Sequence, residues 1–144
     1  AILAGATAED SENLYHFGMH IGVAFQLQDD LLDVYGDPAV FGKNIGGDIL
    51  CNKKTYMLIK ALERADRDQL EGLNHWLSAT SFCPEEKISA VTELYTQIGI
   101  KAVCENKIRE YYTRAMTSLG AVSVIEDKKS ELKKLMKHLM YREM

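Results

Sequence analysis

The sequence from residue 22 to residue 35 reads GVAFQLQDDLLDVY, and it belongs to a longer apolar stretch that runs from about Ala8 to Tyr35. The apolar residues in this stretch are too dense for an alternating strand, and no proline interrupts them. We therefore expect one long, deeply buried helix, which the turn residues Gly36-Asp37-Pro38 bring to an end.

The remainder of the chain also favours helices. Its two prolines, Pro38 and Pro84, both lie between periodic segments. Further helices are expected to begin near Asn52 (a good N-cap residue), after Asp66, at Pro84 and after a break at Gly99, and a final apolar stripe comprises Leu132, Leu135, Met136, Leu139 and Met140. The pattern predicts an all-α protein built as a helical bundle.

The composition is that of an ordinary globular chain. Hydrophobic residues make up 47% and charged residues 26% of the 144 residues, so the chain is long and apolar enough to bury a core. The net charge of -4 argues against nucleic-acid binding, which needs a basic surface. We expect one domain or part of one, with any anionic ligand held locally.

Cysteine usage and hydropathy favour a cytoplasmic protein. Cys51, Cys83 and Cys104 are odd in number and lack CxxC spacing, so they suggest neither a disulfide framework nor a zinc site. No apolar run approaches the roughly 18 residues of a membrane span. A lysine-rich last helix lying on a membrane surface is the alternative to a docked one. Because the chain begins at Ala1 rather than at Met, we expect a piece of a longer helical protein.

Three carboxylates stand among the apolar residues of the first helix. Asp29 and Asp33 are i,i+4 neighbours and Asp30 and Asp33 are i,i+3 neighbours, so all three lean into one region and repel one another. Burying them without a cation would cost several kcal/mol each. Their hard oxygens favour magnesium with a phosphorylated substrate over zinc. The alternative is an exposed acidic helix face, the usual fate of a run of charges.

A basic, glycine-rich loop follows, with FGKNIGGD at residues 41–48 and NKKT at residues 52–55. Lysines in a first helical turn face the positive end of the helix dipole, and a bound diphosphate would resolve that conflict. Solvated lysines and a plain flexible loop are the alternative. The spacing excludes a P-loop, because Asp37 occupies the place of its first glycine and Asn44 follows Lys43, and an EF-hand, because Leu32 replaces a required ligand.

These segments together closely resemble the second half of the trans-isoprenyl diphosphate synthases. The resemblance rests on an ordered set of motifs between about Ala1 and Leu62: GVAFQ at 22–26, DDLLD at 29–33, GK at 42–43, GD at 47–48 and KKT at 53–55. It implies a helical bundle of the isoprenoid synthase type, with residues 1–144 as the C-terminal portion of a single domain. Beyond Asp66 the chain matches only in length and amphipathic character.

The resemblance also assigns the metal site. It implies that Asp29, Asp30 and Asp33 are the second aspartate-rich motif, which together with a first motif binds three Mg²⁺ ions around the allylic diphosphate. Asp29, Asp30 and Lys43 would be the catalytic residues.

Further residues correspond to the family's substrate ligands. Lys43 and Lys53 would hold the diphosphate, Phe25 and Gln26 would line the site, and Thr55 stands where the family has a small hydroxyl residue. The implied reaction is ionisation of the allylic diphosphate, attack by the double bond of isopentenyl diphosphate, and loss of a proton to the released pyrophosphate.

The first aspartate-rich motif and the isopentenyl site would lie upstream of Ala1, so this chain alone is expected to be inactive and its product length cannot be inferred. Family members are commonly homodimers, and we expect the complete protein to form a homodimer as well. The alternatives are a non-catalytic partner subunit of a heteromeric prenyl synthase, a class I terpene cyclase, and a plain helical interaction module.

Overall fold

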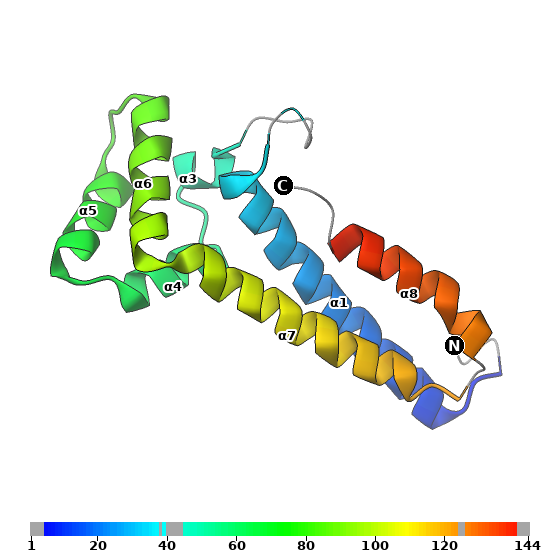
Figure 1. The fold of residues 1–144 in the computed structure, drawn as a ribbon. Coiled ribbons are helices and arrows are strands. Elements are labelled where there is room, and N and C mark those ends of the chain that lie inside the picture. Colours follow the sequence, from blue (N-terminus) through cyan, green and yellow to red (C-terminus); the bar gives the residue numbers. More distant parts are fainter. Residues whose placement is uncertain (1–4, 38, 40–44, 124–125, 141–144) are drawn as a thin grey trace. The chain divides into compact units, whose positions relative to one another are not determined.

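The structure is a computed structural model that describes residues 5–37, 39, 45–123 and 126–140. Every regular element in these ranges is a helix, which confirms the predicted all-α class. The helices are α1 (Ala8–Tyr35), α3 (Gly47–Leu50), α4 (Tyr56–Arg64), α5 (Arg67–Ser78), α6 (Pro84–Ile98), α7 (Ile100–Gly120) and α8 (Glu126–Met140) (Figure 1). Among them, none is long and apolar enough to cross a lipid bilayer.

Most of the expected helix boundaries are confirmed. The first helix covers Ala8–Tyr35, Asp66 caps α5 with a full capping box, and Pro84 lies in the first turn of α6. Gly99 ends α6 in the left-handed conformation, with a φ of 82°. The start predicted near Asn52 is wrong, because α4 begins at Tyr56 with Thr55 as its N-cap.

The chain divides into two compact units, and α1 and α7 each contribute to both. Among the described residues, the first unit comprises residues 5–28, 106–123 and 126–140, and the second comprises residues 29–37, 39 and 45–105.

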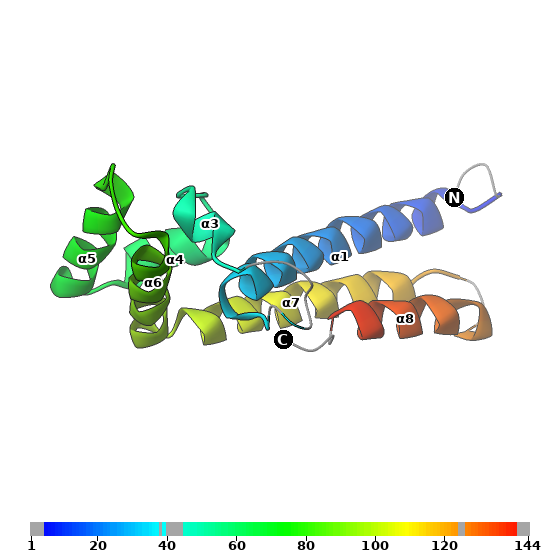
Figure 2. The same ribbon diagram turned by 90° about the horizontal axis from the view of Figure 1, so that it is seen from above.

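In the first unit, the C-terminal part of α7 runs back along the N-terminal part of α1, with α8 beside them (Figures 1 and 2). Phe17, Ile21 and Ala24 lie on the buried side of α1 at helical spacing. The opposite side is exposed, since Tyr15, Met19 and Val23 keep 65%, 46% and 39% of their surface. The part of α1 in this unit is therefore buried along one side rather than all round, whereas residues 30–34, in the second unit, are all buried.

In the second unit, α6 packs against α3, α4 and α5. The core of this unit includes six side chains with almost no exposed surface: Leu31, Leu32, Met57, Leu73, Ile100 and Cys104. Burial, together with the nearby charges of Asp30 and Glu105, raises the pKa of the Cys104 thiol to about 12. Burial thus favours the protonated form of this thiol at neutral pH.

Candidate functional site

The last two turns of α1 bring carboxylates to the negative end of a helix. Asp30 and Asp33 are buried, with 6% and 8% of their surface exposed, whereas Asp29 is exposed. The last turn of α1 carries no basic residue. Carboxylates at a helix C-terminus are disfavoured by the helix dipole as well as by burial, so this end of α1 needs positive charge from another element.

Asp33 joins the following segment to the end of α1. Its Oδ2 accepts the backbone N–H of Asp48 at 3.0 Å, and its carbonyl oxygen accepts the N–H of Gly46 at 2.6 Å. Gly46 has a φ of 91°, and a Cβ there would lie 2.6 Å from the side chain of Ile88. A glycine is thus required for α3 to start where Asp33 holds it.

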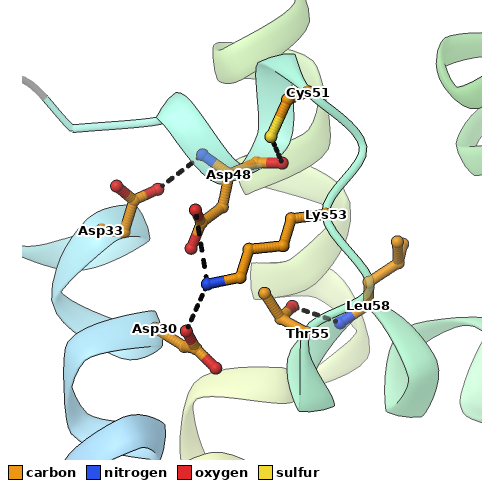
Figure 3. Close-up of polar contacts among 7 residues, drawn as sticks. All are labelled: Asp30, Asp33, Asp48, Cys51, Lys53, Thr55 and Leu58. Carbon is orange, nitrogen blue, oxygen red and sulfur yellow. Dashed lines mark hydrogen bonds and ion pairs between the residues drawn. The ribbon is translucent and has the colours of Figure 1, made fainter.

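Lys53 supplies the positive charge. Its Nζ lies 3.5 Å from Asp30 Oδ1 and 3.9 Å from Asp48 Oδ1, between the two carboxylates (Figure 3). The charge of Asp30, followed by that of Asp48, raises the pKa of Lys53 above its usual value. Because 48% of the Lys53 side chain remains exposed, the ammonium can also reach a ligand from solvent.

Thr55 has a structural contact that the sequence did not reveal. Its side-chain oxygen accepts the N–H of Leu58 at 3.2 Å, so Thr55 is the N-cap of α4. Lys53 and Lys54 consequently precede the cap and do not lie in the first turn, which corrects the expected conflict with the helix dipole. The positive charge of Lys53 offsets the acids of α1 and α3 instead.

The remaining predicted residues lie elsewhere. Phe25 is half-buried and Gln26 is exposed, about one turn before Asp29 on α1. Lys43 lies outside the described residues. The structure thus brings Asp30, Asp33, Lys53 and the cap residue Thr55 to one end of α1 in the second unit.

The donor chemistry of this cluster fits a hard cation. Within the described part of the chain, no group of three or more acidic, histidine or cysteine side chains is arranged to hold a metal ion by itself. Magnesium, however, is commonly bound through one or two carboxylates, with water and substrate phosphates completing its coordination. The buried Asp30 beside the exposed Asp29 meets that requirement in ligand type, while one oxygen of Asp33 is engaged by Asp48.

Sequence reasoning missed Lys87, next to this cluster, and gave its partner Asn52 the wrong role. Lys87 lies on α6 with 1% of its surface exposed, and its Nζ is 2.7 Å from the Oδ1 of Asn52. A signal was present, because Lys87 shares one side of α6 with the buried Val91 and Tyr95 at i+4 and i+8. A lysine on an apolar stripe indicates either a buried charge or a misplaced helix boundary.

Comparison with known proteins identifies the family. The family model described as polyprenyl synthetase matches residues 1–95, which contain all the acids and lysines of the cluster. The chain belongs to the polyprenyl synthetase family. This membership confirms the resemblance found in the sequence, and the isoprenoid synthase type of helical fold with it.

Individual members of the polyprenyl synthetase family align along nearly the whole chain. The geranylfarnesyl diphosphate synthase of Aeropyrum pernix is 31% identical over 136 residues, which are 94% of this chain and 41% of that protein. A crystal structure of a geranylgeranyl pyrophosphate synthase is 34% identical with a TM-score of 0.88, covering 100% of this chain and 45% of that one.

A third relative was solved with ligands. The geranylgeranyl pyrophosphate synthase from Corynebacterium glutamicum, complexed with isoprenyl diphosphate and magnesium, is 31% identical with a TM-score of 0.84. That match covers 96% of this chain and 39% of the other. This polyprenyl synthetase chain therefore spans less than half the length of these three relatives.

Proposed function

We propose that the complete protein is a trans-prenyltransferase that condenses an allylic diphosphate with isopentenyl diphosphate and releases pyrophosphate. The observation that carries the proposal is the half-exposed Lys53 side chain, whose ammonium lies 3.5 Å from the buried Asp30 at the acidic end of α1. Membership of the polyprenyl synthetase family supports it. The Lys53 ammonium is held in place by Asp30 and can still be reached from solvent. It is therefore suited to bind a diphosphate leaving group, which gains negative charge as it departs.

The acidic residues are proposed to hold magnesium. Asp29 and Asp30 offer carboxylate oxygens, and Asp33 belongs to the same metal-binding motif. Asp29, Asp30 and Asp33 would hold the magnesium, which would supply Lewis-acid stabilisation of the departing diphosphate. Binding of three ions in the complete enzyme is part of the proposal.

The chain's own groups are proposed to bind and orient the diphosphate. Lys53 and Lys43 donate hydrogen bonds to its oxygens, and Phe25 and Gln26 line the site. Thr55, two residues after Lys53, caps α4 and so fixes the end of the segment that carries Lys53. Charge on the leaving group grows as the bond between carbon 1 and oxygen breaks, so fixed ammonium groups stabilise the transition state more than the substrate.

No covalent nucleophile is needed in this scheme. The electron pair of the breaking carbon–oxygen bond stays with pyrophosphate, and the double bond of isopentenyl diphosphate supplies the pair for the new carbon–carbon bond. A proton then leaves the condensed chain for a pyrophosphate oxygen. The chain's contribution is therefore to clamp the leaving group and to exclude water from the carbocation.

The proposal extends to the setting of the enzyme. Residues 1–144 are taken as the C-terminal portion of one isoprenyl synthase domain, inactive alone, in a cytoplasmic enzyme of isoprenoid biosynthesis. The complete protein is proposed to be a homodimer.

An activity assay of the complete natural protein tests the proposal. With radiolabelled isopentenyl diphosphate, an allylic diphosphate and Mg²⁺, we expect a longer prenyl diphosphate and released pyrophosphate, and neither when the metal is chelated. Consumption of the allylic diphosphate without isopentenyl diphosphate would indicate a terpene cyclase instead. A folded protein that yields no product alone, but does so with a second subunit, would indicate a non-catalytic partner.

A further inference from the structure

Lys87 is a buried cation with neutral partners. Its side chain keeps 1% of its surface, and its Nζ donates to Asn52 Oδ1 at 2.7 Å and approaches the carbonyl oxygen of Leu50 at 3.5 Å. The ammonium also lies 4.4 Å from the centre of the Phe82 ring. Burying a lysine is costly unless its donors are satisfied, so these contacts fix the ammonium in one place.

The contacts of Lys87 converge on the turn that leads to Lys53. Asn52 has a positive φ of 55°, and its Nδ2 donates to the carbonyl oxygen of Leu77 at 3.1 Å. Its side chain therefore ties the turn to both α5 and α6. Asparagine tolerates the left-handed region better than most residues, and the contacts with Lys87 and Leu77 fix the Asn52 side chain there.

Lys53 follows directly in the chain and depends on this turn for its position. Its backbone N–H donates to the carbonyl oxygen of Asp48 at 3.0 Å, and its side chain then extends toward Asp30. Lys53, Asn52 and Lys87 also line one small cavity of about 20 Å³. A displacement of the turn would therefore move the Lys53 ammonium away from the acids.

We propose that Lys87, acting through Asn52, is a positioning residue that sets the Lys53 ammonium for binding of a diphosphate. The inference rests on the proposed role of Lys53 as a diphosphate ligand. It adds that α6 takes part in the site without touching the ligand. Lys87 locks the turn, so that the entropy of ordering Lys53 is lost on folding rather than on binding.

A double-mutant cycle separates positioning from general stability. Binding of inorganic pyrophosphate with Mg²⁺ is measured by calorimetry for the complete protein, Lys53→Met, Lys87→Met and the double variant. We expect Lys87→Met to weaken pyrophosphate binding about tenfold in the otherwise unchanged protein. In the Lys53→Met background, the same substitution should weaken binding by less than about twofold. Asn52→Gly, which keeps the positive φ but removes the side chain, is expected to act like Lys87→Met.

Val91→Ala is the matched control, because it removes a buried side chain one turn further along α6. It should lower stability and leave pyrophosphate affinity within about twofold. Hydrogen exchange supplies a readout that needs no ligand. Lys87→Met and Asn52→Gly should speed exchange of the Lys53 amide about tenfold. Val91→Ala should speed exchange of the Lys53 amide no more than it speeds exchange of the amides in α4.

The outcomes are distinct. If Lys87→Met weakens pyrophosphate binding equally whether residue 53 is Lys or Met, the positioning role is overturned and the proposed function stays intact. The same follows if Asn52→Gly leaves the exchange rate of the Lys53 amide unchanged. Affinity that is lost in Lys53→Met but unchanged in both Lys87→Met and Asn52→Gly would do the same. A folded complete protein that binds no pyrophosphate would overturn the proposed function and this inference together.

Discussion

A single ammonium group, that of Lys53, faces carboxylates from two elements, Asp30 on α1 and Asp48 on α3. The raised pKa of Lys53 keeps it charged throughout the physiological pH range. Since nearly half of the side chain is exposed, these ion pairs are screened by salt and contribute little to stability. The value of Lys53 therefore lies in where its charge is held rather than in the folding energy it supplies.

Asp10 gives a pH dependence at the scale of one residue. Its Oδ1 accepts the N–H of Ser123 at 2.9 Å, its Oδ2 accepts the hydroxyl of Ser123, and these hydrogen bonds lower the pKa of Asp10 below 3.8. A lowered folded pKa stabilises the fold above the unfolded value, and that contribution is lost as the pH falls through the folded pKa. Asp10→Asn should therefore lower the urea midpoint at pH 7, and the difference should shrink as the pH is lowered below 3.8.

Glu9→Gln is the control for Asp10, since it removes the same charge from an exposed side chain of the same turn. The urea midpoint of Asp10→Asn could lie as far below that of the unchanged protein near pH 2 as at pH 7. In that case the hydrogen bonds from Ser123 do not stabilise the ionised form of Asp10.

Individual residues differ in how far the sequence predicts them. Asp30 could be singled out because apolar neighbours make a carboxylate expensive there, and Lys53 because a basic loop follows. Asn52 and Lys87 could not be paired, since 35 residues separate them and only the packing of α6 on α3 joins them. Long-range hydrogen bonds of this kind leave no local period in the sequence.

At the scale of elements, most helix boundaries were predictable from local residue chemistry, and one start was not. Gly99 was expected to interrupt a helix because glycine enters the left-handed region without strain, and it does so. The start of α4 was placed too early because asparagine is a good N-cap in general. Here Asn52 has a positive φ and bonds to Leu77, and the cap passes to Thr55.

Gly46 and Gly99 permit a matched test of why each is glycine. Both have positive φ, but a Cβ at Gly46 would meet Ile88 at 2.6 Å, whereas nothing lies within 4 Å of one at Gly99. Gly99→Ala should cost about 1–2 kcal/mol from the backbone alone. Gly46→Ala should cost at least about 1 kcal/mol more, because the new methyl group crowds the packing.

Urea unfolding of the two glycine variants measures the difference. In an Ile88→Ala background, the extra cost of Gly46→Ala should disappear. If the two alanine variants prove equally destabilised, the close approach of α3 to α6 at Ile88 is not what restricts residue 46.

At the scale of the whole molecule, the acids and Lys53 belong to the second compact unit, whereas the relatives are more than twice as long as this chain. Under the proposed function, binding of a diphosphate and turnover of substrates are separable properties. Binding would need the end of α1, the turn and Lys53. Turnover would need in addition a second acidic motif and an isopentenyl site in other parts of the complete enzyme.

The most direct test of the central claim is a calorimetric titration of the complete natural protein with inorganic pyrophosphate, with and without Mg²⁺. It is compared with a variant in which Asp29, Asp30 and Asp33 are changed to Asn. A control variant, Glu63→Gln with Asp68→Asn and Glu71→Gln, removes the same charge from exposed positions of α4 and α5.

We predict metal-dependent pyrophosphate binding that the control retains and the aspartate variant loses, with all three proteins folded by circular dichroism. Equal binding by the aspartate variant, or loss of binding in the control as well, would contradict the assignment of a metal and diphosphate site to the end of α1.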